Sequence, residues 1–277
     1  MDNSKFNYSL QYCNWHADTK QSYDTDLAYA RKFFSDHNIY PKKKDSRICE
    51  IGCGMGRFLS MLKEEGYDNL TGVDIDKVLV KIARRDIENI HLADAIDFLS
   101  NTHDIFDVIY VFDVLEHIAK EKQLEFLRLI YSRLKDDGFV VFSIPNALAP
   151  SGMLYRYDDF THTVSYCSNT ISFLLNNAGF PYMNIRPQYK ESEEVINIKK
   201  TWADIYRIEF GMKDVILTPN LVVVAFKIES MYNAYMYNAP IIENNYGNTP
   251  IQTPSTQKMG IAKVYSKIIQ HLKHKIL

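Results

Sequence analysis

The chain has 277 residues and a net charge of −2, with 46% hydrophobic and 24% charged residues. This composition is ordinary for a globular protein, and the near-zero charge gives no basic field that would recruit nucleic acid. The length accommodates one large α/β domain with additional segments, or two small domains.

The cysteines and the apolar runs set further limits on the class of protein. Cys13, Cys49, Cys53 and Cys167 form no C-x-x-C pair, so the pattern does not indicate zinc and we expect no metal. We expect these thiols to be reduced, as in a reducing cytoplasm. The first ten residues are polar and no run of about 18 apolar residues occurs, so we expect a cytoplasmic protein without a secretory signal or membrane span.

Residues 1–45 precede the first predicted strand and form the first of three predicted parts. An apolar face predicts a helix over 26–34. One interpretation is a helix packed on the edge of the domain. The other is a lid over a bound cofactor, formed by aromatic side chains of this segment: Tyr12, Trp15, His16 or Tyr23.

Residues 46–228 form the second part, in which strand and helix patterns alternate. The apolar runs predict strands over 47–51, 69–74, 90–92, 106–112 and 139–144. Helical patterns lie between them at 56–65, 77–85, 95–99 and 122–134. This alternation predicts a parallel sheet with helices on both faces. A loop follows residue 145, and then come a helix at 168–177, a strand at 182–186, a helix at 202–210 and a strand at 221–228.

Residues 229–277 form the third part. Residues 229–257 are rich in Asn, Tyr, Pro and Thr without apolar periodicity, which predicts a flexible linker. Residues 258–277 predict a basic amphipathic helix, because apolar residues share one face and lysines occupy the rest. Two interpretations stay open: contact with the inner membrane surface, or docking on its own domain or on a partner such as a second copy.

The most informative stretch is Glu50-x-Gly52-x-Gly54-x-Gly56, directly after the first predicted strand. Glycines there allow a ligand to approach the backbone, and the following helix presents its N-terminus. A dinucleotide fingerprint requires a third glycine where Arg57 stands, and no Walker A lysine follows. The Glu50 carboxylate would repel a pyrophosphate but attract an ammonium group.

Acidic residues also end the next predicted strands. Asp74 is placed to accept both hydroxyls of a ribose, and Asp94 to accept a hydrogen bond from an adenine amino group. The fourth strand leads into Asp113-Val114-Leu115-Glu116-His117. Because ligands bind at the carboxyl ends of parallel strands, these segments predict one shared crevice.

Together these motifs resemble class I S-adenosylmethionine-dependent methyltransferases over residues 45–228. The resemblance implies a Rossmann-like, seven-stranded, mostly parallel sheet whose last strand is antiparallel. It implies S-adenosylmethionine as cofactor, S-adenosylhomocysteine as product and a small-molecule acceptor. No N-P-P-Y-like tetrad follows the fourth strand, which disfavours nucleic acid. The implied cofactor-binding residues are Glu50, Gly52, Cys53, Gly54, Gly56, Arg57, Phe58, Asp74, Ile75, Asp94, Ala95, Phe112, Asp113, Val114 and His117.

Methyl transfer to a hydroxyl needs an aligned acceptor and a base beyond the fourth or fifth strand. The first candidate base is His162, because imidazole titrates near neutral pH and Asp158 or Asp159 could orient it. A structural hydrogen bond at the next helix is the alternative role for His162. For His117 we expect a scaffold role first and catalysis second. Arg156 could bind an acidic acceptor or form an ion pair with its neighbouring aspartates.

The stretch from Tyr155 through Arg156, Tyr157 and Asp158 to His162 resembles a segment of bacterial O-methyltransferases of surface-polysaccharide biosynthesis. This resemblance implies that these residues bind a sugar, a nucleotide-sugar or a phosphate-bearing capsule precursor. Two alternatives stay open: methylation of a quinone or lipid-like phenol, and a non-catalytic assembly protein that binds S-adenosylmethionine. The presence of the acidic and histidine motif residues argues against the non-catalytic alternative.

Overall fold

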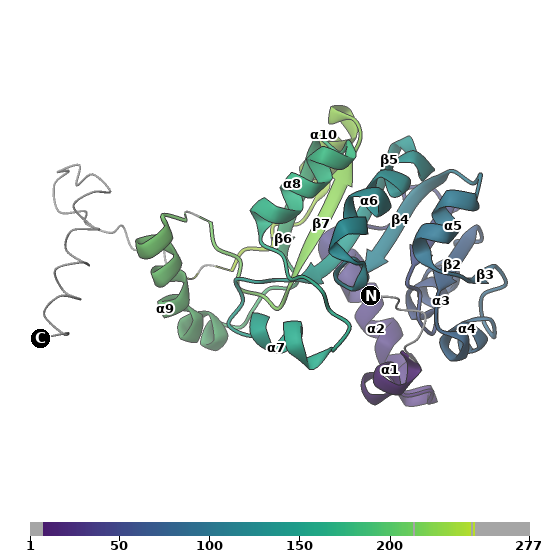
Figure 1. Cartoon of the computed structure of the whole chain (residues 1–277), viewed down its shortest axis with the longest axis horizontal. Helices are drawn as coiled ribbons and strands as arrows, with labels where there is room; N and C mark the ends of the chain where they lie inside the picture. The colour runs from purple at the N-terminus through teal and green to yellow at the C-terminus, as the bar shows by residue number, and fades with distance from the viewer. Residues whose placement is uncertain (1–7, 213, 245, 247–277) are drawn as a thin grey trace, which may run out of the picture. The chain divides into compact units, whose positions relative to one another are not determined.

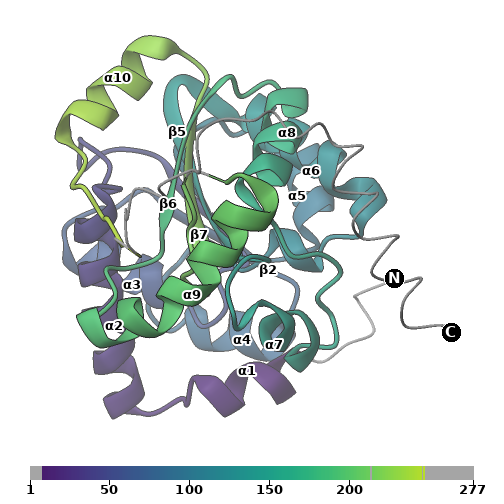
Figure 2. The same ribbon diagram turned by 90° about the vertical axis from the view of Figure 1, so that its left-hand side faces the viewer.

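A computed structural model describes residues 8–212, 214–244 and 246, which belong to one compact unit (Figures 1 and 2). Residues 247–277, with the predicted basic helix at 258–277, lie outside the described residues. Among the helices of the described ranges, none combines the length and apolar character needed to cross a bilayer.

A seven-stranded sheet in the order β3-β2-β1-β4-β5-β7-β6 forms the centre of the unit. β7 runs antiparallel to both β5 and β6, while the ladders from β3 to β5 are parallel. The Rossmann-like prediction with an antiparallel last strand is therefore confirmed. The strands are β1 (Ile48–Ile51), β2 (Leu70–Asp74), β3 (Ile90–Leu92), β4 (Phe106–Phe112), β5 (Leu134–Pro145), β6 (Tyr182–Pro187) and β7 (Asn220–Phe226).

Helices cover both faces of the sheet (Figure 2). The helices, including the short 3-10 helices η2 and η3, are α1 (Ser9–Trp15), α2 (Lys20–His37), α3 (Arg57–Glu64), α4 (Lys77–Ala83), α5 (Ala95–Asn101), η2 (Leu115–His117), η3 (Lys120–Lys122), α6 (Gln123–Arg133), α7 (Gly152–Asp158), α8 (Ser168–Ala178), α9 (Glu193–Phe210) and α10 (Glu229–Asn238). One core cluster joins α2, α3, α4 and α10 to the sheet, and a second joins α5, α6 and α8 to it.

The central strands contribute side chains to both core clusters, because successive side chains of a strand point to opposite faces of the sheet. Val108 and Tyr110 of β4 belong to the first cluster, whereas Ile109 and Val111 belong to the second. All four side chains are at most 2% exposed. Continuous apolar strands are typical of a sheet covered on both faces, which explains why the sequence pattern located them closely.

The C-terminal end of the described unit corrects one prediction. Residues 229–238 form α10 instead of a linker, and Tyr235 buries its ring against the first core cluster. Its hydroxyl donates to the carbonyl oxygen of His37 at 2.9 Å. The sequence pattern missed this helix because its packed face is made of tyrosines instead of aliphatic residues.

Several elements are longer than predicted: β5 begins at Leu134 instead of residue 139, and α2 spans Lys20–His37 instead of residues 26–34. α9 begins at Glu193, well before the predicted residue 202, because the Ser192 hydroxyl caps it by accepting from the Val195 N–H at 3.3 Å. The loop after β5 contains the short helix α7, which the sequence did not indicate. Both views place α1 and α7 at the same end of the sheet (Figures 1 and 2).

Replacing Tyr235 tests the docking of α10. We expect Tyr235→Ala to lower the free energy of unfolding by about 3 kcal/mol, because it removes a buried ring and its hydrogen bond. Tyr237→Ala is the matched control on the same helix, since Tyr237 is 90% exposed, and it should change stability by less than about 0.5 kcal/mol. Equal, small effects of both variants in urea titrations would show that α10 is not docked.

Candidate active site

The glycine loop after β1 has a backbone conformation that other residues rarely adopt. Gly52, Gly54 and Gly56 all have positive φ, at 74°, 52° and 73°. A Cβ on Gly52 would lie 2.2 Å from Cγ2 of Val114, and one on Gly54 would lie 2.9 Å from Oη of Tyr12. The loop therefore depends on glycine for both its conformation and its close contacts.

Asp74 holds this loop in place from the end of β2. Its Oδ2 accepts the Gly54 N–H at 2.8 Å, and its Oδ1 accepts the Asp76 N–H at 2.8 Å. Burial raises the pKa of Asp74, and these backbone N–H groups oppose that rise. The carboxylate is thus fixed beside the loop, in the position predicted for a ribose contact.

Glu50 is the buried acid at the end of β1. Its side chain is 2% exposed, and no described residue forms a hydrogen bond with its Oε2. Burial, followed by the charge of Asp74, raises the pKa of Glu50 well above its usual range. A buried carboxylate without a partner is costly, so this position suits a ligand that brings a cation, such as the ammonium group of S-adenosylmethionine.

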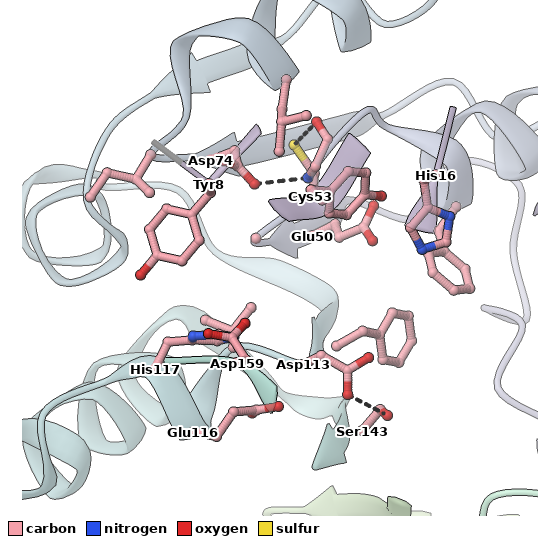
Figure 3. Close-up of a pocket in the computed structure, with 18 of the residues that line it drawn as sticks. Tyr8, His16, Glu50, Cys53, Asp74, Asp113, Glu116, His117, Ser143 and Asp159 are labelled. Atoms are coloured by element: carbon pink, nitrogen blue, oxygen red, sulfur yellow. Dashed lines mark hydrogen bonds between the residues drawn. The ribbon is translucent and has the colours of Figure 1, made fainter. Parts of the chain in front are cut away.

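A cavity of about 760 Å³ opens between these residues and the loop after β4 (Figure 3). Most of the predicted site residues line it. They are Glu50, Gly52, Cys53, Gly54, Arg57, Phe58, Asp74, Ile75, Asp94, Ala95, Phe112, Asp113, Val114, His117, Tyr155, Asp158, Asp159 and His162. As expected for residues at the carboxyl ends of parallel strands, side chains from five separate segments of the sequence meet at this cavity.

Asp94 lines the cavity from the start of α5. Its Oδ1 accepts the N–H groups of Ile96 at 2.8 Å and Asp97 at 3.2 Å, so the side chain caps the helix. This cap fixes the carboxylate at the cavity wall next to Ala95. The position is compatible with the predicted adenine contact through the other oxygen, Oδ2.

Asp113 follows β4 with a φ of 53°, which is unusual for a residue other than glycine. Its Oδ1 accepts from the Ser143 hydroxyl at 3.1 Å and from the Asn220 amide at 2.7 Å. Burial raises the pKa of Asp113 to about 6. A strained acid with a raised pKa at a cavity wall is typical of functional sites.

His117 and His162 lie next to each other, with ring centroids 4.6 Å apart. Nδ1 of His117 lies 2.8 Å from the Thr161 hydroxyl, which itself donates to Asp159 at 2.6 Å. Nδ1 of His162 donates to the Tyr155 carbonyl at 2.6 Å. Burial, and then the neighbouring His162, lower the pKa of His117 to about 4.

Three predicted residues do not line the cavity. The Arg156 guanidinium donates to the carbonyls of His162 and Thr163, so it fastens its own loop instead of facing an acceptor. Tyr157 is 68% exposed beside that guanidinium. Gly56 starts α3, and a Cβ there would lie 3.1 Å from that of Ala83, so its role is local packing.

The N-terminal segment contributes residues that motif analysis did not assign to the acceptor site. Tyr8, Tyr12 and His16 line the cavity from α1 and the residue before it, together with Tyr29 and Phe33 of α2. The lid interpretation thus fits Tyr12 and His16, whose rings stack at 4.7 Å. Tyr23 packs on the Arg57 guanidinium outside the cavity, and the side chain of Trp15 lies outside the described residues.

Other lining residues carried no sequence signal at all. Ser143, Gln188 and Asn220 come from β5, the residue after β6 and the start of β7. They reach the cavity only because these elements end at the same edge of the sheet.

Comparisons with known proteins agree with this site. A family model described as a methyltransferase domain matches residues 22–183. A carboxy-S-adenosyl-L-methionine synthase of Campylobacter fetus is 26% identical over 52% of this chain and 65% of its own length. A ubiquinone biosynthesis O-methyltransferase of Hydrogenovibrio crunogenus is 28% identical over 37% of this chain and 44% of its own. The chain thus spans less than two thirds of the length of either relative.

A solved methyltransferase structure is also similar to this chain. The S-adenosylmethionine-dependent methyltransferase from Archaeoglobus fulgidus superposes with a TM-score of 0.60 and 25% identity. The match covers 79% of this chain and 99% of that protein.

Replacing Asp74 tests the cofactor site. We expect Asp74→Ala to weaken binding of S-adenosylhomocysteine at least about 100-fold in calorimetry, since both the ribose contact and the anchor of the glycine loop are lost. Asp68→Ala, at an exposed aspartate before β2, is the control and should bind normally. An unchanged dissociation constant for the Asp74 variant would remove this residue from the site.

Proposed function

This chain belongs to the methyltransferase domain family, and we propose that it transfers the methyl group of S-adenosylmethionine to a hydroxyl oxygen of a small acceptor. One observation carries the proposal. The cavity has the buried Glu50 carboxyl on one side and a cluster of acidic and histidine side chains on the other (Figure 3). In that figure Glu50, Cys53 and Asp74 lie across the pocket from Glu116, His117 and Asp159.

The residues present fit the cofactor. Glu50 would hold the ammonium group, Asp74 the ribose hydroxyls and Asp94 the adenine amino group. When bound, the cofactor supplies a methyl group on a positively charged sulfur. The chain's own contribution is to align the acceptor, exclude water and accept a proton.

The transfer is an in-line displacement. The acceptor oxygen would form a bond to the methyl carbon while the carbon–sulfur bond breaks, and the sulfur would keep the electron pair. The hydroxyl proton passes to a base on the cavity wall. Two groups can accept it: His162, whose Nε2 carries a lone pair because Nδ1–H donates to a carbonyl, and Asp113, with its pKa of about 6.

For the acceptor we favour a sugar hydroxyl. Tyr155, Asp158 and His162 line the cavity, and they belong to the segment that resembles surface-polysaccharide O-methyltransferases. With Arg156 engaged by backbone carbonyls, the wall opposite the glycine loop is mainly acidic. A neutral, polyhydroxylated acceptor such as a sugar fits that wall better than a phosphate-bearing precursor.

A second acceptor class has a specific observation in its favour. Tyr8, Tyr12, Tyr29 and Phe33 give the cavity an aromatic side that suits the ring of a quinol or another phenol. The relative from Hydrogenovibrio crunogenus is named as a ubiquinone biosynthesis O-methyltransferase. Phenols therefore belong beside sugars in any acceptor screen.

A screen with labelled S-adenosylmethionine against sugars, sugar nucleotides and quinols tests the proposal. With the acceptor that it identifies, we expect His162→Gln to lower kcat by about 10²–10⁴-fold, because the transfer loses a group that activates the hydroxyl. The dissociation constant of S-adenosylhomocysteine should stay within about threefold of the wild-type value.

His103→Ala is the control, since His103 is exposed and lies outside the cavity. Turnover at the wild-type rate in the His162 variant would exclude His162 from the chemistry. A labelled product that carries no O-methyl group would overturn the proposed reaction.

A further inference from the structure

Three ligand-type side chains meet on the acceptor side of the cavity. Glu116 and His117 come from η2 after β4, and His162 comes from the loop after α7. One carboxylate oxygen of Glu116 and one ring nitrogen of each histidine lie within 4.8 Å of one another. None of these residues stands near a cysteine motif, so the cysteine spacing could not indicate them.

Glu116 is the unusual member of this cluster. Its side chain is fully buried, and neither of its carboxylate oxygens has a hydrogen-bond partner among the described residues. Nε2 of His162 lies 3.9 Å from Oε1 of Glu116, and this distance is too long for a hydrogen bond. A carboxylate buried in this way is costly unless a cation lies beside it, and no lysine or arginine of the described residues forms an ion pair with Glu116.

Hydrogen bonds set the protonation of both histidines. The Tyr155 carbonyl can only accept, so Nδ1 of His162 carries a hydrogen, and in the neutral ring the lone pair is on Nε2. The Thr161 hydroxyl gives its hydrogen to Asp159, so it accepts from Nδ1 of His117. A neutral His117 therefore also carries its lone pair on Nε2. Ligating histidines are usually oriented by such a bond at the other nitrogen.

We propose that Glu116, His117 and His162 bind one divalent transition-metal ion. Two imidazole nitrogens and one carboxylate favour ions such as Zn²⁺, Mn²⁺, Fe²⁺ or Co²⁺ over Mg²⁺ and Ca²⁺, which prefer oxygen. A metal at about 2.1 Å from each donor requires the donors to close by about 1 Å, which side-chain rotation can supply. Oδ2 of Asp159, 3.8 Å from Nε2 of His162, lies near enough to act as a further ligand.

The site has a role in the proposed methyl transfer, on which this part of the inference rests. Three protein ligands leave coordination positions open for acceptor oxygens. An acceptor with two adjacent hydroxyls, a sugar cis-diol or a catechol, could bind through both. The metal would lower the pKa of the attacking hydroxyl, whose proton would pass to Asp113 because Nε2 of His162 is occupied.

Metal binding to the full chain, with any affinity tag removed, gives the test. After treatment with a chelator and desalting, the protein is titrated with Co²⁺ and followed by visible absorption, and with Zn²⁺ by calorimetry. We expect one equivalent of each ion to bind, with Co²⁺ absorption bands typical of mixed nitrogen and oxygen ligands. Mg²⁺ should compete at least about 100-fold more weakly.

Variants locate the ion in this cluster. Glu116→Gln, His117→Ala and His162→Ala should each weaken binding at least about tenfold, and Thr161→Val, which removes the acceptor for Nδ1 of His117, by about 10–100-fold. His103→Ala should bind normally, and circular dichroism should confirm that every variant is folded. Absence of a bound equivalent, or equal affinity in folded cluster variants and wild type, would overturn the site.

This test separates the metal site from the methyl transfer. If the metal-free protein binds S-adenosylhomocysteine and methylates its acceptor at the full rate, the proposed role of the metal in the transfer fails and the proposed function stands. If one ion binds through the cluster but no O-methyl product forms with any acceptor, the site stands and the proposed function fails.

Discussion

The Glu50 carboxylate, buried at the end of β1 without a partner for Oε2, is the feature on which the account of the site depends. Burial raises the pKa of this carboxyl, and a ligand that brings a positive charge stabilises its ionised form. The glycine loop after β1 surrounds this carboxyl and is held in a fixed conformation. Its glycines keep the backbone close to β2, and Asp74 fastens it through the Gly54 N–H. Glu50 lines the cavity beside this loop, where the methionine end of the cofactor would lie.

The acceptor side of the cavity also contains a buried acid, but its surroundings suit a cation of a different charge. Glu116 is also buried without hydrogen-bond partners among the residues described, and it faces two imidazoles whose tautomers are set by neighbouring acceptors. A monovalent ammonium suits Glu50, whereas a divalent ion suits the richer donor set around Glu116. Between the two lies the region in which the sulfonium methyl and the acceptor oxygen would meet.

The sequence predicted the parts of the site that depend on local rules. The glycine loop and the acids at strand ends follow from strand periodicity and from the common edge at which parallel strands finish. The pairing of Glu116 with His162 does not follow from such rules. It depends on Thr163, whose N–H and hydroxyl both bind the Glu116 carbonyl, at 2.7 and 2.8 Å, across 47 residues of sequence.

Sequence reasoning misplaced Arg156 and missed Tyr8 for the same reason. Arg156 has the chemistry of an anion-binding residue, but the backbone carbonyls of its own loop engage it. Tyr8 carries no motif, yet its ring meets the edge of His117 at 5.7 Å because α1 folds over the cavity. Tertiary contacts determine the positions of both side chains, and such contacts could not be predicted from a single sequence.

The most direct measurement of the central claim compares two ligands on the Glu50→Gln variant. S-adenosylhomocysteine carries the ammonium group, whereas 5′-methylthioadenosine has the same nucleoside but lacks the amino-acid portion. If Glu50 holds the ammonium, calorimetry will show affinity for S-adenosylhomocysteine falling about 10–100-fold, while affinity for 5′-methylthioadenosine stays within about twofold. An equal loss for both ligands, or no loss for either, would contradict the assignment of Glu50.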